Sequence, residues 1–400
     1  MKSVYKLLGI AAIVAAAVLA SSCNKDETAK KFNLTVKVTL PENVSEVQNL
    51  TVEATKGNKV TALEVVTDTA IVASASLPQG DYKISVNGAV SSAKNVNVVG
   101  AAEVSLYADQ EITVALDMTV QSPLLIKAVQ YTPGKQYYIQ PLSDTWIEIV
   151  NNSDEVQYLD QIILIGGMGR QSGPNAWQAN GYAHLYGGGA QSPVYAFPGN
   201  GTDYPLQPGK SVVVANAPIN HTAQGEGFEN CADLSKADWE FYGSYNKKDT
   251  DYEGIPNMEL VYCAFPSQLN WGQNFFAWAG AIIKLPEGTT PAQYAADPEN
   301  LMVTPGTESS FQYLMFPSEY VLDAIDVWEL DSEEHYPTFL AIDDAEGVTG
   351  PAAWSGQAVR RKVTKIENGR AYYKDTNKSS ADMVVEKVVP GAEPTKVDAE

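Results

Sequence analysis

The sequence predicts an all-β protein built of two successive β-sandwiches, and three observations lead to this prediction. From Phe32 to Leu40 apolar and polar residues alternate strictly, which places every apolar side chain on one face of a strand. Short runs of the same kind recur between turn signals as far as residue 118, without a helical period. Gln121-Ser122-Pro123 then interrupts the pattern, and a second series of apolar strands begins at Leu124.

The first sandwich is predicted for residues 32–121. Turn signals stand at Lys56-Gly57-Asn58 and at Leu77-Pro78-Gln79-Gly80. After the strand that begins at Phe32, the expected strands are Leu50–Ala54, Val60–Val66, Ala70–Leu77, Tyr82–Val86, Lys94–Val99 and Ile112–Met118. About seven short strands in a region of this size are typical of a small β-sandwich.

The segment Leu77–Ile84 resembles the turn of transthyretin-like and carboxypeptidase-regulatory-like immunoglobulin (Ig) domains. That resemblance implies an Ig-like spacer between an anchor and a working domain. The alternative is a carbohydrate-binding sandwich, which would need exposed tryptophan. Residues 32–121 contain no tryptophan, so we interpret this domain as a spacer.

The second domain is predicted for residues 122–400, and three ordered segments of it resemble the lamin-tail domain. They are Trp146–Asp160, the strand Leu206–Ala215, and a closing part made of Gln357–Lys362, Asn368–Arg370 and Asp375–Met383. The lamin tail is a compact sandwich, whereas these segments spread over a much longer stretch here. We therefore expect an expanded lamin-tail-like β-sandwich with long insertions, and insertions are where new sites arise.

The N-terminus indicates export and lipidation. A basic start at Met1–Lys6 precedes the apolar run Leu7–Ala20, which is too short to span a bilayer, and small residues then lead to Cys23. This resembles a bacterial lipoprotein signal, with residues 1–22 removed, Cys23 lipidated and residues 23–31 as a tether. The alternative is an ordinary secretory signal with an incidental cysteine. Asn24-Lys25-Asp26-Glu27 resembles the signal that sends Bacteroidota lipoproteins to the outer face of the outer membrane.

The whole arrangement resembles an uncharacterised family of Bacteroidota surface lipoproteins encoded beside outer-membrane receptors. The resemblance implies an accessory component of a TonB-dependent uptake system that captures a nutrient such as an iron chelate, haem or a glycan. The alternative is a structural or adhesive surface protein that binds another protein or a matrix. A net charge of −21 argues against a nucleic-acid partner, although acidity also serves solubility alone.

Residues for catalysis do not converge in the sequence. His184, His221 and His335 are scattered, and no Gly-x-Ser-x-Gly, phosphate-binding loop or His-Glu-x-x-His motif is present. We therefore expect no enzyme activity, no catalytic residue and no cofactor. Asp249, Asp251 and Glu253 alternate as in a Ca²⁺ site or as in a solvated acidic loop, which leaves a metal site open.

The candidate ligand-binding residues lie in an insertion at Gly166–Asp203. They are aromatic or imidazole side chains among Gly, Asn and Gln, namely Trp177, Tyr182, His184, Tyr186 and Tyr195. Such residues suit stacking on a sugar, a catecholate or a flat macrocycle, and equally suit a packed loop that covers a sheet. Tyr182, His184 and Tyr186 alternate, so an extended backbone would place all three on one face.

Three further expectations concern single segments. Cys231 and Cys263 form either one disulfide or two free thiols. Thr289-Thr290 predicts the start of a short helix that ends at Pro298. Arg360, Arg361, Lys362 and Lys365 are predicted to share an exposed strand face, with a hairpin turn at Asn368-Gly369.

Overall fold

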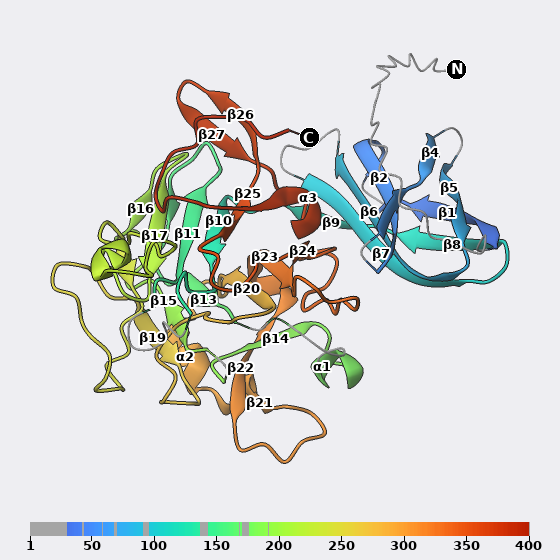
Figure 1. Ribbon diagram of the computed structural model, residues 1–400. Coiled ribbons are helices and arrows are strands. Elements are labelled where there is room, and N and C mark those ends of the chain that lie inside the picture. Colours follow the sequence, from blue (N-terminus) through green and yellow to red (C-terminus); the bar gives the residue numbers. More distant parts are fainter. Residues whose placement is uncertain are drawn as a thin grey trace.

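The computed structural model describes residues 30–41, 44–57, 59–67, 70–90, 96–136, 143–167, 169, 176–190 and 192–399. Cys23 and the predicted signal lie outside the described residues, so the lipid anchor stays a prediction. The chain is nearly all β, with short helices between strands (Figure 1). The predicted all-β class is thereby confirmed.

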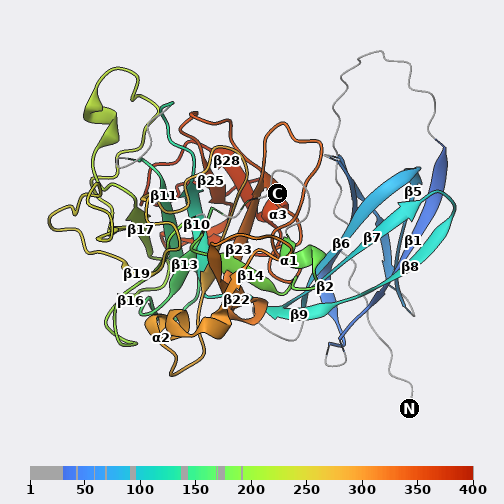
Figure 2. The same cartoon turned by 90° about the horizontal axis from the view of Figure 1, so that it is seen from below.

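In the part of the chain that the structure describes, strands β1 to β9 pair only with one another and form a small two-sheet sandwich. Figures 1 and 2 show it as a separate unit beside a larger domain. One sheet has the order β4 (Glu64–Thr67), β5 (Ile71–Pro78), β1 (Lys31–Thr39), β8 (Gln110–Ala115). The other has the order β3 (Lys59–Ala62), β2 (Val47–Lys56), β6 (Gly80–Val90), β7 (Val96–Leu106), β9 (Asp117–Val120). The alternating apolar residues of both sheets, such as Leu34 and Ile84, form the shared core.

Two of the strands predicted as continuous each contribute to both sheets. The chain leaves one sheet at the end of β3 and enters the other at β4, with buried Leu63 at the bend. It crosses again between β8 and β9 at buried Leu116. The prediction of single strands at Val60–Val66 and Ile112–Met118 is therefore wrong, because a corner that turns a strand from one sheet to the other keeps the alternating pattern.

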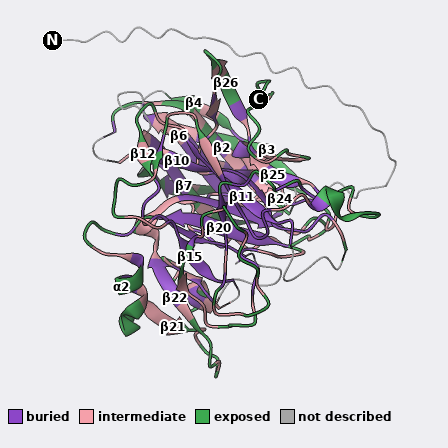
Figure 3. Ribbon diagram, turned by 90° about the vertical axis from the view of Figure 1, so that its left-hand side faces the viewer, coloured by how far each residue is buried: buried purple, intermediate pink, exposed green. Residues whose placement is uncertain are grey.

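The larger domain is a sandwich of two six-stranded sheets. The first has the order β18 (Trp239–Glu240), β17 (Ser211–Ala215), β11 (Trp146–Asn151), β10 (Leu124–Gln130), β25 (Ala358–Arg361), β28 (Met383–Glu386). The second has the order β19 (Glu259–Tyr262), β15 (Val194–Ala196), β13 (Ile163–Ile165), β20 (Trp278–Ile283), β23 (Val321–Trp328), β24 (Val348–Thr349). Residues from both sheets meet in one core, and these strands are the buried centre of Figure 3. Both sheets pack so deeply that β10, β11 and β20 are buried along their whole length.

Smaller elements decorate this sandwich. They are the three-stranded sheet β14 (Leu185–Gly188), β22 (Gln312–Pro317), β21 (Leu301–Val303), the pair β12 (Gln157–Tyr158) and β16 (Pro205–Leu206), and the hairpin β26 (Val363–Glu367) and β27 (Arg370–Tyr373). The helices are α1 (Ala176–Ala179), α2 (Pro291–Ala296) and α3 (Ser379–Asp382), with 3₁₀ turns η1 (His221–Gln224), η2 (Pro298–Asn300) and η3 (Ser318–Tyr320). Among the described residues, no helix has the length and apolar character that a membrane crossing requires.

The predicted helix and hairpin turn are confirmed. Thr290 caps α2 by accepting a hydrogen bond from the Gln293 backbone N–H, and the Gln293 side chain accepts one from the Thr290 backbone in return. Asn368 and Gly369 both have positive φ, 53° and 79°, which is the geometry of a tight hairpin between β26 and β27.

The expected exposed basic face is wrong at Arg361. Its guanidinium is buried and donates to both carboxylate oxygens of Asp323 at 2.8 and 2.7 Å. Asp375 lies 3.4 Å and Asp382 3.7 Å from the same group. These three acids come from β23, from the segment after β27 and from α3, and together they compensate the desolvation of one arginine. The sequence around Arg361 gives no sign of them.

The joint between the two domains is polar and buried. The Lys378 ammonium forms an ion pair with Glu53 of β2 and another, at 3.0 Å, with Glu346 of the larger domain. Thr55 donates to Glu346 at 2.9 Å, and Lys83 donates to the carbonyl of His335 at 2.8 Å. One face of the sheet that contains β2 and β6 therefore packs in the sandwich core, while its other face contacts the larger domain.

Candidate functional site

The five aromatic and histidine residues predicted to bind a ligand lie in separate places. Tyr195 is fully buried in the core and lies 5.3 Å from the ring of Phe241. Tyr186 is buried beside Phe339 and donates a hydrogen bond of 2.6 Å to Asp343. These two rings serve as packing, which corresponds to the alternative of a loop that covers a sheet.

The other three predicted residues are at the edge of the same insertion. Trp177 of α1 packs edge-on against Tyr313, and its indole N–H points to the sulfur of Met302 at 3.1 Å. Tyr182 and His184 are exposed, and a turn at Ala183–His184 precedes β14. Because of this turn the backbone is not extended, and the predicted shared face of Tyr182, His184 and Tyr186 does not form.

Both cysteines are free thiols, so the disulfide alternative is wrong. Cys231 lies beside Asp144, a carboxylate that also accepts hydrogen bonds from the backbone N–H groups of Gly134 and Ala232. Burial, together with this neighbouring acid, raises the pKa of the Cys231 thiol to about 12. Cys263 has a different neighbour, Tyr245, whose side chain it contacts by a hydrogen bond.

The acidic loop uses its carboxylates to order its own backbone. Asp249 accepts from the backbone N–H of Gly243 at 2.7 Å, and Asp251 accepts from the side chain of Asn257 at 3.3 Å. Within the described residues, no group of three His, Cys, Asp or Glu side chains is arranged to hold a metal ion.

A groove of 660 Å³ lies at one open end of the larger sandwich, where strands of both sheets begin or end. We call it the sandwich-end groove. Strands β10 and β23 begin here and β20 ends here, so loops from both sheets form its walls. Its volume is in the usual range of ligand sites, about 300–1,000 Å³. Its lining residues are Pro123, Leu124, Gln157, Tyr158, Asp160, Gln161, Ile162, Asn200, Gly201, Lys284, Leu285, Pro286, Glu287, Gly288, Thr289, Thr290 and Leu322.

One wall of the groove is built on Asp160. Its carboxylate accepts three backbone hydrogen bonds, from Gly201 at 2.9 Å, Asp203 at 2.8 Å and Tyr204 at 2.9 Å. Gly199 and Gly201 have positive φ, which lets the backbone curl tightly around this one side chain. These hydrogen bonds outweigh the partial burial of the carboxyl and hold its pKa below the ordinary value. The wall is therefore ordered before any ligand arrives.

The opposite wall is the connection from β20 to α2. Leu285 is buried and anchors it to the core, and the capped Thr290 fixes its far end. Lys284, directly before Leu285, and Glu287, between the two fixed points, are exposed. Among the described residues, neither charged group has a hydrogen-bonding or ion-pair partner, and the same is true of the exposed Tyr158 hydroxyl across the groove. These groups are free to bind a ligand.

The sequence did not point to this groove. Gln157, Tyr158 and Asp160 stand in the lamin-tail-like segment, whereas the opposite wall lies more than a hundred residues later. The glycine- and asparagine-rich segment 199–203 indicated a loop, but its pairing with Asp160 is a tertiary contact that the sequence does not specify.

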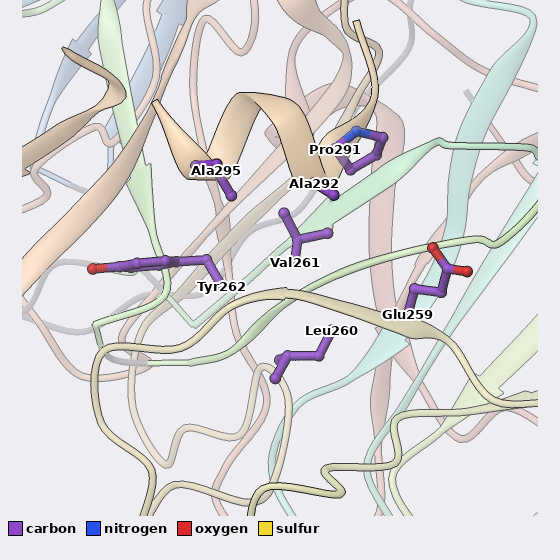
Figure 4. Close-up of a pocket in the computed structure, with 8 residues that line it drawn as sticks. Glu259, Leu260, Val261, Tyr262, Pro291, Ala292 and Ala295 are labelled. Atoms are coloured by element: carbon purple, nitrogen blue, oxygen red, sulfur yellow. The ribbon is translucent and has the colours of Figure 1, made fainter. Parts of the chain in front are cut away.

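A second, apolar groove of 310 Å³ separates α2 from the edge strand β19 (Figure 4). Val261 lies below Ala292 in this view, and Tyr262 lies to one side of Ala295. The Tyr262 hydroxyl donates to the carbonyl of Gln312 at 3.2 Å. Helix α2 here covers an edge strand, which is a common way of preventing strand pairing with another chain. We interpret this groove as a packing seam.

Part of the larger domain is similar to a known protein family. Residues 207–390 match the model of DUF4876, a family described as proteins of unknown function. This stretch, less than half of the chain, is similar to that family. It includes the β20–α2 wall of the sandwich-end groove and Leu322, whereas the Asp160 wall precedes the matched residues. No curated protein matches the chain.

A solved structure extends the likeness to nearly the whole chain. The crystal structure of a DUF4876 family protein from Bacteroides thetaiotaomicron VPI-5482 matches with 23% identity and a TM-score of 0.58, over 92% of this chain and 99% of that chain. The two chains therefore share a fold. A DUF3823 family protein from Parabacteroides merdae ATCC 43184 matches over 35% of this chain and 67% of its own, with 11% identity and a TM-score of 0.17, which is too low to indicate a common fold.

Proposed function

We propose that this protein is a lipid-anchored component of the outer-membrane surface that captures a nutrient for a TonB-dependent receptor, without enzyme activity of its own. The observation that carries the proposal is the sandwich-end groove, which combines a ligand-sized volume, an ordered wall on Asp160 and polar groups free of protein partners. The lipoprotein-like sequence around Cys23 supports the proposed location at the outer-membrane surface.

The arrangement of the two domains supports the same function. The N-terminal sandwich is docked on the larger domain through the buried Lys378 ion pairs, so it serves as a spacer in contact with that domain. A spacer of this kind holds the binding domain away from the membrane surface, and a receptor in the same membrane could then accept the ligand directly.

Affinity purification of the intact lipoprotein from mildly solubilised outer membranes tests the proposal. We expect mass spectrometry to detect an outer-membrane receptor in stoichiometric amount. A Cys23→Ala variant is the control, because it should leave the outer-membrane fraction and lose the receptor. Recovery of the wild-type lipoprotein alone would contradict the uptake function.

One observation favours the adhesive alternative. Phe265 and Phe311 are 44% and 42% exposed, and their rings meet edge to face at 5.3 Å on the surface. Exposed Leu260 stands on β19, a few residues before Phe265. Paired exposed aromatic rings are typical of contacts with another protein. Substitution of both phenylalanines by serine would abolish cell adhesion to a protein matrix under this alternative and leave receptor recovery unchanged.

A further inference from the structure

We propose that the sandwich-end groove binds a neutral carbohydrate chain, an inference that rests on the nutrient-capture function proposed above. The apolar lining residues are the buried Leu124, Ile162 and Leu285 and the half-buried Leu322, which we call the floor of the groove. A pyranose ring presents C–H groups on its faces and hydroxyls at its edges. An apolar floor between polar walls matches this distribution.

The polar groups of the groove suit hydroxyl ligands. Gln157, Gln161 and Asn200 carry amides whose nitrogens each donate one hydrogen bond to the protein, at 3.2 Å in all three cases. Each amide keeps a second N–H donor and its carbonyl oxygen for a ligand hydroxyl. Tyr158 is 42% exposed and presents both a ring face and a hydroxyl. Sugars stack on tyrosine rings in this manner, with the apolar C–H face against the ring.

The charges of the groove argue against an anionic ligand. Lys284 is balanced by Glu287 on the same loop, and Asp160 has its carboxylate occupied by three backbone N–H groups. An iron–catecholate chelate is anionic and would be held by several cationic groups. A single lysine beside a glutamate does not supply this attraction.

The lining residues also argue against haem. Haem iron is held in proteins by His, Cys, Met or Tyr. The groove contains no His, Cys or Met among its described lining residues, and the only tyrosine, Tyr158, lies on an open rim strand. The three nutrient classes expected from the sequence are thus reduced to one by the chemistry of the walls.

Affinity electrophoresis of the detergent-solubilised full-length lipoprotein tests the inference. Native gels would contain starch, a mixed-linkage β-glucan, xylan or mannan as probes. We expect at least one of these to retard the protein, and we expect Tyr158→Ala to weaken that binding about tenfold, as for the loss of one aromatic contact. Tyr107→Ala removes an exposed tyrosine from the N-terminal sandwich and is the matched control, with unchanged retardation.

A second variant distinguishes the ligand classes. Tyr158→Ala should weaken carbohydrate binding more than Lys284→Gln does, whereas Lys284→Gln should weaken binding of an anionic iron chelate more than Tyr158→Ala does. Retardation that persists in Tyr158→Ala would overturn the groove as the site. Absence of retardation by all four polysaccharides, with haemin or a ferric catecholate bound instead, would overturn the carbohydrate class. Because receptor recovery is measured separately, that result would leave the uptake function intact.

Discussion

Asp326 illustrates how a single side chain is set by its surroundings. It lies on β23, is almost fully buried, and accepts hydrogen bonds from the backbone N–H of Thr338 at 2.5 Å and from the Thr338 hydroxyl at 3.4 Å. Burial raises the pKa of this carboxyl to about 7, and the hydrogen bonds from Thr338 and the nearby Lys83 ammonium offset only part of that effect. Burial also raises the pKa of the neighbouring Asp344 carboxyl.

A carboxyl whose pKa is raised in the folded state makes stability depend on pH. The folded state binds the proton more tightly than the unfolded state, so this contribution is complete below pH 4 and is lost as the pH rises through about 7. In the Asp326→Asn variant the amide oxygen still accepts from the Thr338 N–H, and the amide NH2 donates to the Thr338 hydroxyl in place of accepting from it. We expect this variant to lose about 2 kcal/mol less stability between pH 5 and pH 8 than the wild type. Denaturant unfolding at the two pH values measures the difference.

The control for this experiment is Asp331→Asn, because Asp331 is an exposed residue on the loop after β23. Its stability should follow the wild-type pH dependence. Parallel curves for wild type and Asp326→Asn would contradict the raised pKa.

Elements show a similar division between local and distant causes. The β26–β27 hairpin is determined locally, since Asn368 and Gly369 occupy the two positions that need positive φ. The passage of the chain from β3 to β4 is not determined locally. The bend at Leu63 depends on where the two sheets lie, which the local sequence pattern does not specify.

Substitution of the hairpin glycine tests the local part of this view. Gly369→Ala should destabilise the protein by about 1 kcal/mol, because φ at this residue is 79° and a Cβ disfavours that conformation even though no atom lies within 4 Å of it. Thermal or denaturant unfolding gives the value. The neighbouring Glu367→Ala, which removes only an exposed ion pair with Lys365, should cost less than about 0.5 kcal/mol. Equal effects of the two substitutions would count against a backbone origin.

At the scale of the whole molecule, a few buried charges join the domains. The Lys378 ammonium contacts Glu53 and the hydroxyl of Ser85, both from the N-terminal sandwich, and Glu346 from the larger domain. Attraction to these acids outweighs the burial of the ammonium, so its pKa is raised and it remains charged at neutral pH. Asn97 and Gln121 add hydrogen bonds to the carbonyl of Asp375.

Removal of this central charge should loosen the joint. Lys378→Met leaves the buried Glu346 and the partly exposed Glu53 without their cation. We expect a loss of about 3 kcal/mol together with faster amide exchange in β2 and β6. Hydrogen exchange followed by mass spectrometry locates the change. Lys365→Met is the matched control, because Lys365 is exposed on β26 and its ammonium pairs with Glu367 rather than with a group of the joint. Protection in β2 and β6 that is unchanged in Lys378→Met would show that other contacts hold the domains together.

Local chemistry in the sequence was sufficient to predict the all-β class, the α2 helix and the β26–β27 turn. In each case the deciding interactions act between residues close in the chain: alternating burial, the Thr290 cap and the positive φ of Gly369. The predicted aromatic site was misplaced, since hydrophobic rings such as Tyr186 and Tyr195 look the same in sequence whether they pack in a core or bind a ligand.

Tertiary structure alone decided which charges are buried and where a ligand could bind. Arg361 is buried because Asp323, Asp375 and Asp382 converge on it from other parts of the chain. The sandwich-end groove exists because loops distant in sequence, one ordered by Asp160 and one anchored by Leu285, meet at the same end of two packed sheets. The physical reason is the same in both cases: desolvation and cavity shape depend on neighbours in space, which a local pattern of residues does not specify.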